Sequence, residues 1–176
     1  MLDLETLSIR PESVILTIGA VRFDPFSGYI DLERGLYCRV NVDEQIAMGR
    51  HVLESTLEWW GRQDPEVMAE ALGDENRVTV DDMTKELNKF VVGAENIWCQ
   101  GPVFDICILE NLYRQLDKPA PWNYWQIRDS RTLFGVHGDP REKNREAAHN
   151  ALMDCYYQAQ GIQQIYKRQG IEKRKW

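Results

Sequence analysis

Apolar and β-branched residues gather in short runs along the first 40 residues, and such runs predict β-strands. The strongest run, residues 14–21 (VILTIGAV), is continuous enough for a central strand that is buried on both faces. Strands are therefore predicted at residues 1–5, 13–23 and 33–40. The turn-forming residues 24–28 (DPFSG) separate the second strand from the third.

Further along the chain the apolar positions return every three or four residues, which is the period of an amphipathic helix. Residues 55–72 are predicted to form two short helices that break at Asp64-Pro65, with Ser55 as a candidate cap. The remaining predicted elements are helices at 80–92 and 104–116, short strands at 96–99 and 125–128, and a long helix from Asn150. This order predicts an α/β protein with a mixed sheet flanked by helices.

Composition predicts a single domain at residues 1–170 with a charged tail at 171–176. Apolar residues make up 43% of the chain, and no apolar run approaches the length of a membrane span. The first residues are acidic, so no signal peptide is expected. The four cysteines are far apart and form no C-x-x-C pair, which predicts reduced thiols. We therefore expect a cytoplasmic protein with no membrane partner.

The net charge of −7 argues against sequence-independent binding along a duplex, because that binding needs a broad basic face. It does not argue against binding a single strand end. Bound divalent cations would also reverse the local charge wherever carboxylates cluster.

Asp3 and Glu5 are the first candidates for chemistry. Alternate residues of a strand point to the same face, so both carboxylates can approach one point. Burying two such groups is costly, and a hard divalent cation offsets that cost. The same pattern recurs at residues 31–33 (DLE), among turn-forming and basic residues that suit a solvated strand. Taken alone, Asp3 and Glu5 are better explained as two exposed acids near a terminus, and only the context of the other segments can overturn that interpretation.

Asp105, His149 and Asp154 are the next candidates. Asp105 lies in the first turn of a predicted helix, where a carboxylate can simply cap the helix. His149 and Asp154 would diverge by about 140° if both were helical, since each helical residue turns by about 100°. They converge only if His149 lies on a loop and the helix begins near Asn150. The preceding residues 141–146 are polar and unpatterned, as expected for a mobile loop; a surface histidine and a solvated acid are the alternative.

Three segments in this order resemble the DEDDh 3′–5′ exonucleases, which include polymerase proofreading domains, oligoribonuclease and ribonuclease T. The segments are residues 3–6 (DLET), 101–109 (GPVFDICIL) and 148–154 (AHNALMD). The resemblance spans about residues 1–165 and is closest to a branch of phage-type exonucleases and ribonuclease AS. Members of the family have several residues before the first Asp. Here only Met1 and Leu2 precede it, so a shortened strand or a start inside a longer reading frame is expected.

The resemblance implies a ribonuclease H-like fold with a five-stranded mixed sheet and helices on both faces. It implies two divalent metal ions, Mg²⁺ or Mn²⁺, with Asp3 bridging both ions. Glu5 and Asp154 would complete one metal site and Asp105 the other. His149 would take a proton from the attacking water. The activity implied is a 3′–5′ exonuclease that releases nucleoside 5′-monophosphates from single-stranded 3′ ends, with RNA weakly favoured. Related proteins also imply a homodimer.

Four further residues are candidates for contact with the terminal nucleotide. Thr6 and Leu7 follow the acidic strand and could offer backbone groups, while Phe104 is a candidate wedge. Trp59 either packs in the core or stacks under a terminal base. Three other functions remain open: an exodeoxyribonuclease on single-stranded DNA, a catalytically silent nucleic-acid-binding module, and a metal-dependent hydrolase of small phosphodiesters.

Overall fold

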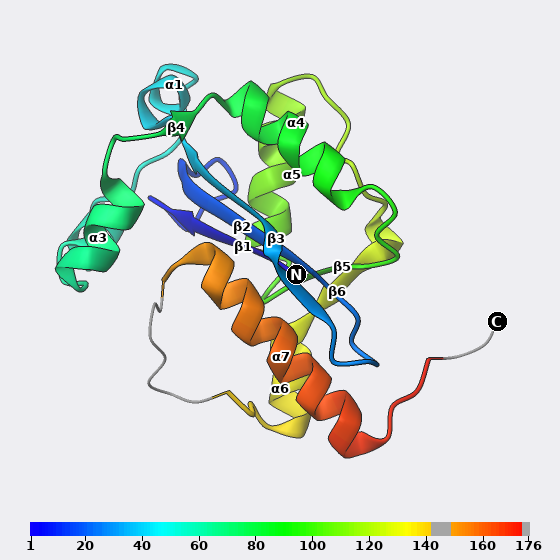
Figure 1. Ribbon diagram of the computed structural model, residues 1–176. Helices are drawn as coiled ribbons and strands as arrows, with labels where there is room; N and C mark the ends of the chain where they lie inside the picture. The colour runs from blue at the N-terminus through cyan, green and yellow to red at the C-terminus, as the bar shows by residue number, and fades with distance from the viewer. Residues whose placement is uncertain (142–148, 174–176) are drawn as a thin grey trace.

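A computed structural model of the protein describes residues 1–141 and 149–173 (Figure 1). The strands are β1 (Leu2–Thr6), β2 (Ile15–Phe23), β3 (Ile30–Val40), β4 (Arg77–Val78), β5 (Ile97–Cys99) and β6 (Ile127–Asp129). The helices are α1 (Val42–Ala47), α2 (Glu54–Trp60), α3 (Pro65–Leu72), α4 (Val80–Val91), α5 (Asp105–Gln115), α6 (Ser130–His137) and α7 (Ala151–Gln169), with a 3₁₀ turn, η1, at Tyr124–Gln126. The predicted mixed α/β class is confirmed.

The strands form two sheets. One has the order β1-β2-β3-β4, in which β2 pairs antiparallel with both β1 and β3, and β4 pairs parallel with β3. The other is the parallel pair β5-β6. The prediction of one continuous five-stranded sheet is therefore wrong for the described residues. A physical reason lies at the edge of β1, where the backbone N–H of Leu4 donates to Asp105 Oδ1 (3.2 Å) instead of to a neighbouring strand.

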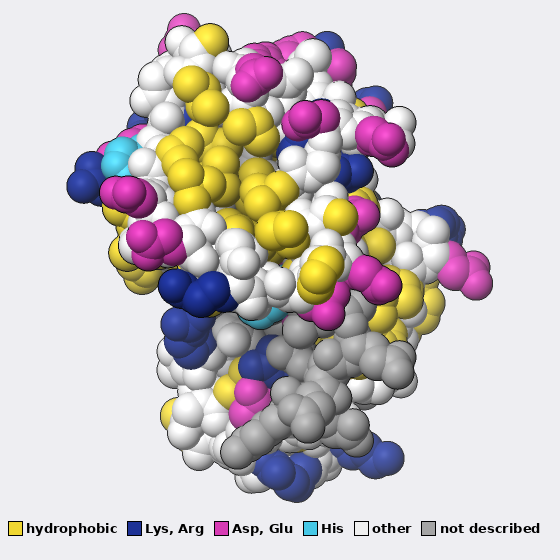
Figure 2. All heavy atoms as spheres, turned by 90° about the vertical axis from the view of Figure 1, so that its left-hand side faces the viewer, with side chains coloured by type: hydrophobic (Ala, Val, Ile, Leu, Met, Phe, Trp, Pro, Cys, Tyr) yellow, Lys and Arg dark blue, Asp and Glu magenta, His cyan; other side chains and the backbone are white. Residues whose placement is uncertain are grey.

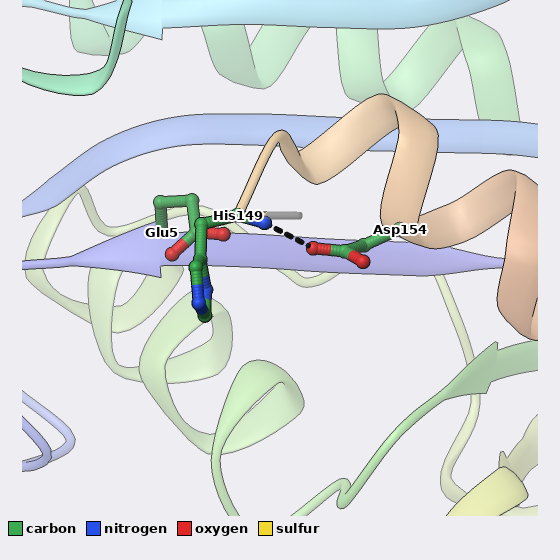
Figure 3. Close-up of side chains that lie close together, drawn as sticks. All are labelled: Glu5, His149 and Asp154. Atoms are coloured by element: carbon green, nitrogen blue, oxygen red, sulfur yellow. Dashed lines mark hydrogen bonds between the residues drawn. The ribbon is translucent and has the colours of Figure 1, made fainter. Parts of the chain in front are cut away.

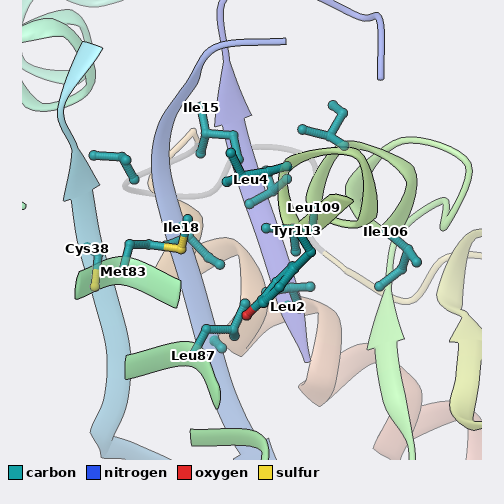
Figure 4. Packing of buried hydrophobic residues seen from close by; sticks show 14 of the residues in the cluster. Leu2, Leu4, Ile15, Ile18, Cys38, Met83, Leu87, Ile106, Leu109 and Tyr113 are labelled. Carbon is teal, nitrogen blue, oxygen red and sulfur yellow. The ribbon is translucent and has the colours of Figure 1, made fainter. Parts of the chain in front are cut away.

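Helices cover both faces of the larger sheet (Figure 1), as predicted. The alternation along β1 sends Leu2 and Leu4 into a cluster with α4 and α5, while Asp3 and Glu5 face α7. Members of this cluster labelled in Figure 4 are Leu2, Leu4, Ile15, Ile18, Cys38, Met83, Leu87, Ile106, Leu109 and Tyr113. Beneath α7, a second cluster includes residues such as Val21, Trp98 and Ile162. The acidic strand is thus held between two apolar layers.

Helix α7 rests directly on the backbone of β2 at Gly19. A Cβ atom at Gly19 would lie 2.3 Å from the carbonyl carbon of Ala151 and 2.3 Å from the nitrogen of Leu152. Gly19 is also the partner of Asp3 in the β1–β2 register. Because no side chain separates the two backbones, the first turn of α7 lies over the acidic strand.

Two local predictions are wrong. Ser55 is not the cap of α2, since the helix begins at Glu54 and its N-cap is Leu53. The strand predicted at 125–128 starts later, at Ile127, because Tyr124–Gln126 forms the 3₁₀ turn. That turn is closed by a hydrogen bond from the backbone N–H of Asn123 to Gln126 Oε1 (2.8 Å).

The cysteine prediction is confirmed. All four thiols are free; Cys38, Cys99 and Cys155 are buried, and Cys107 is half-buried. In the part of the chain that the structure describes, no helix combines the length and the apolar content needed to cross a bilayer.

The Gly19 contact makes a testable prediction about stability. Gly19→Ala should lower the free energy of unfolding by about 1–3 kcal/mol, because the new methyl group overpacks backbone that cannot rotate away. Gly135→Ala in α6 is the matched control, since its Cβ would meet nothing within 4 Å. That change should be neutral or stabilise by up to about 1 kcal/mol. Urea unfolding measures both, and a Gly19→Ala protein as stable as the wild type would contradict the prediction.

Candidate functional site

The site is built on the face of β1 that looks toward α7. Asp3 and Glu5 are half-buried, whereas Leu2, Leu4 and Thr6 between and beside them are buried. The ladder with β2 fixes both acids in place, and Glu5 lies opposite Thr17 in that ladder. Strand alternation therefore presents two carboxylates to the same space, as predicted from their spacing.

Asp105 joins the two acids from the start of α5. Its side chain is 3% exposed, and its Oδ1 accepts the hydrogen bond from the backbone N–H of Leu4, midway between Asp3 and Glu5. The N-cap of α5 is Phe104, which makes no side-chain capping bond. Asp105 therefore connects the helix to the acidic strand and is more than a helix cap.

His149 and Asp154 converge because His149 lies before the helix and Asp154 lies in its first turn, which is the arrangement that their spacing in the sequence required. Asn150 caps α7, because its Oδ1 accepts from the backbone N–H of Met153 (3.1 Å), so the helix begins at Ala151. His149 precedes the helix with a left-handed backbone (φ 65°). Its backbone N–H donates to Asp154 Oδ2 (3.0 Å). This bond turns the histidine back over the first turn of α7. Of the predicted loop at 141–146, all but Arg141 lies outside the described residues.

Figure 3 shows Glu5, His149 and Asp154 together at the end of β1. Each of the three offers one ligand atom, and these atoms lie within 4.8 Å of one another. Asp3 is close by, since Gln158 Nε2 on α7 donates to Asp3 Oδ1 (2.8 Å). Residues from β1, α5 and α7 that are far apart in sequence thus form one acidic site.

Crowding and burial raise the pKa values of these acids. The pKa of Asp3 lies well above its usual range, first because its carboxylate is buried and then because Asp105, Glu5 and Asp154 repel its charge. The pKa of Glu5 is raised by burial and by Asp154 and Asp105. Burial also raises the pKa of Asp105 to about 7, although the hydrogen bond from the Leu4 N–H and the charge of Arg131 oppose the shift. Crowded hard oxygen donors of this kind fit a divalent cation such as Mg²⁺ or Mn²⁺.

A cavity of about 340 Å³ adjoins Glu5. Its lining includes three of the predicted nucleotide contacts: Thr6, Trp59 and Phe104. Leu7 does not line it. The backbone groups of Leu7 are already paired, since its N–H donates to Val14 O (2.9 Å) and its C=O accepts from Leu53 N (2.8 Å), and its side chain belongs to a buried apolar cluster.

Trp59 has a contact that neither sequence interpretation contained. Its ring meets the His149 ring edge to face, with centroids 4.9 Å apart and planes at 89°. Trp60 is buried, and its Nε1 donates to the backbone oxygen of Thr6 (3.0 Å), which anchors α2 to the end of β1. Trp59 is half-buried, so it lines the cavity and supports the histidine at the same time.

Two residues of the site were missed at the level of sequence. Gln158 bonds to Asp3, and its spacing of four residues from Asp154 is a signal that could have placed it on the same helical face. Gly19 permits the approach of α7, but one glycine inside a strand carries no signal of which element packs against it.

Comparison with known proteins identifies the class. Residues 1–166 match the family model described as the 3′–5′ exoribonuclease Rv2179c-like domain. The chain therefore belongs to this 3′–5′ exonuclease family. It is also 28% identical over 158 residues to the exodeoxyribonuclease of Enterobacteria phage T4, an alignment that covers 75% of this chain and 68% of that protein. The predicted nuclease class is confirmed.

The raised pKa values predict how metal-free stability depends on pH. Between the ordinary Asp pKa of about 3.9 and the folded-state pKa of Asp105 of about 7, Asp105 keeps its proton in the folded protein and has lost it in the unfolded chain. In chelator, the free energy of unfolding should therefore fall as pH rises from about 4 to about 7. Urea unfolding at several pH values measures this slope.

Asp105→Asn is the control for the slope, since it keeps an oxygen for the Leu4 N–H and removes one titrating group. Its metal-free stability should depend less on pH than that of the wild type. A wild-type stability that rises with pH through this range would contradict the assignment of crowded, buried acids.

Proposed function

We propose that the protein is a DEDDh-type 3′–5′ exonuclease with a ribonuclease H-like fold. Its action is to remove nucleoside 5′-monophosphates from single-stranded 3′ ends in the presence of Mg²⁺ or Mn²⁺. One observation carries the proposal: Glu5, His149 and Asp154 offer ligand atoms within 4.8 Å of one another, on a face shared with Asp3 and bonded to Asp105 through Leu4. Family membership over residues 1–166 supports it.

Four carboxylates would hold the metal ions: Asp3, Glu5, Asp105 and Asp154. When bound, two divalent ions stabilise the attacking and the leaving oxygens of an in-line phosphoryl displacement. The protein contributes the positions of the donors. Asp3 and Glu5 are fixed by the β1–β2 ladder, and Asp105 by its bond to Leu4. The repulsion that raises the pKa values of Asp3 and Glu5 also favours cations over neutral ligands at this position.

His149 is proposed as the general base that accepts a proton from the attacking water. Its backbone is held by Asp154 Oδ2 and its ring by the edge of Trp59. These two contacts keep the imidazole beside the carboxylates, where a water molecule that attacks phosphorus would lie. Once the proton is removed, the water oxygen attacks phosphorus and the bond from phosphorus to the 3′-oxygen of the penultimate nucleotide breaks. That oxygen then takes up a proton from solvent water.

The surroundings of the acids favour a strand end over a duplex. A cavity of about 340 Å³ is at the small end of ligand pockets, which run from about 300 to 1,000 Å³, and suits one terminal nucleotide. Figure 2 views the side of the molecule that carries α1 and α3, and hydrophobic side chains gather across its upper half with acidic ones around them. In this upper half, the described residues offer stacking contacts for bases and form no broad basic track for a duplex backbone.

RNA is the first candidate substrate and single-stranded DNA the second. The matched family is described as exoribonuclease, which favours RNA, whereas the phage T4 relative is named exodeoxyribonuclease. Glu5 and Thr6 both line the cavity, so a carboxylate oxygen is available to accept a hydrogen bond from a 2′-hydroxyl. The Thr6 hydroxyl already donates to Ser8 O (2.7 Å), which leaves it only as an acceptor.

Oligomers labelled at the 5′ end test this proposal. With Mg²⁺ or Mn²⁺, single-stranded RNA should shorten stepwise from the 3′ end and release 5′-monophosphates, and chelator should stop the reaction. Internal cuts would refute an exonuclease, and faster loss of DNA would reverse only the choice of sugar.

The chain offers a matched control for the same assay. Asp3→Asn should abolish the ladder, because the proposed metal sites lose their shared carboxylate. Asp31→Asn changes the same pattern (DLE) on β3, where Asp31 forms an ion pair with Arg34 (2.9 Å) apart from the site. Asp31→Asn should cut at the wild-type rate.

A further inference from the structure

Gln158 is an unusual side chain for its position in the core. It lies on α7 four residues after Asp154, on the same face of the helix, and is 3% exposed. Its neighbours in the helix, Cys155, Ala159 and Ile162, belong to an apolar cluster. Glutamine is mostly found exposed, so burial here calls for a specific partner.

That partner is the Asp3 carboxylate, whose Oδ1 accepts a hydrogen bond from Gln158 Nε2 (2.8 Å). The other end of the amide is less well placed. Within residues 1–141 and 149–173, Gln158 Oε1 is buried and has no hydrogen-bond partner. A buried acceptor left without a donor is destabilising, and this cost offsets the stability that the bond to Asp3 contributes. Stability of the fold alone therefore does not explain a glutamine at this position.

The geometry points to Gln158 as a positioning residue that holds the Asp3 carboxylate in the orientation needed to bind divalent metal, an inference that rests on the proposed function. A carboxylate on a short side chain can rotate about its last bond, and repulsion from Glu5, Asp105 and Asp154 pushes it away from the shared face. The bond to Oδ1 opposes this rotation and leaves Oδ2 without that contact. Hydrogen bonds to metal ligands act in this way at many metal sites.

Mn²⁺ binding measured by calorimetry tests the inference without relying on catalysis. Gln158→Met keeps the length of the side chain and removes the donor, so Mn²⁺ should bind about 10–100-fold more weakly than to the wild type. Gln164→Met is the matched control on the exposed side of the same helix and should leave the affinity unchanged. The metal-free melting temperature of Gln158→Met should stay close to that of the wild type, because the substitution removes the unpaired Oε1 and also leaves Asp3 Oδ1 without its donor.

A double substitution separates positioning from a general effect on the fold. If Gln158 acts through Asp3, adding Gln158→Met to Asp3→Asn should leave Mn²⁺ affinity at the value set by Asp3→Asn alone. Unchanged affinity in Gln158→Met, or two effects that multiply in the double variant, would overturn the inference.

The nuclease assay keeps the two proposals distinct. A wild-type protein that binds Mn²⁺ in a Gln158-dependent way but degrades no oligomer would sink the exonuclease proposal and leave the role of Gln158 standing. A Gln158→Met protein with wild-type Mn²⁺ affinity and stepwise cleavage would overturn the role of Gln158 and leave the exonuclease proposal standing.

Discussion

The contact of the α7 backbone with Gly19 is the constraint on which the site depends. Gly19 is paired with Asp3 in the β1–β2 ladder, and a Cβ atom there would lie 2.3 Å from the backbone of α7. Because the helix starts directly over this pair, Asp154 and Gln158 extend from its first two turns toward the acidic strand. A wider separation between strand and helix would leave the acids of β1 without their partners.

The site combines a stable frame with an electrostatically unfavourable centre. Apolar clusters on both sides of β1 hold the strand in place, as Leu2 and Leu4 pack toward α4 and α5 while Val21 packs under α7. Between these layers, burial and mutual repulsion raise the pKa values of Asp3 and Glu5. Packing thus imposes a charge arrangement that the chain alone does not favour, and bound divalent cations would relieve it.

Local patterns made part of this structure predictable from sequence. The apolar run of β2 and the break at Asp64 before α3 each depend on residues that are adjacent in the sequence, so a local pattern predicts them. The start of α7 is predicted in the same way by its cap, Asn150. Helix α1 was not predicted, although Asn41 caps it, because six residues carry too little periodicity. The sheet division depends on the Leu4 N–H bonding to a side chain one hundred and one residues away.

The motifs predicted one site for the carboxylates and His149, but the other side-chain contacts between distant segments were beyond sequence reasoning. Neither spacing nor composition shows that Trp59 meets His149, that Gln158 bonds to Asp3, or that the backbone of Leu7 is already hydrogen bonded.

The central claim, that β1, α5 and α7 together form a two-metal site, is tested most directly by the stoichiometry of Mn²⁺ binding at equilibrium. The account predicts two Mn²⁺ ions per chain at saturation; a wild-type protein that binds none would contradict it.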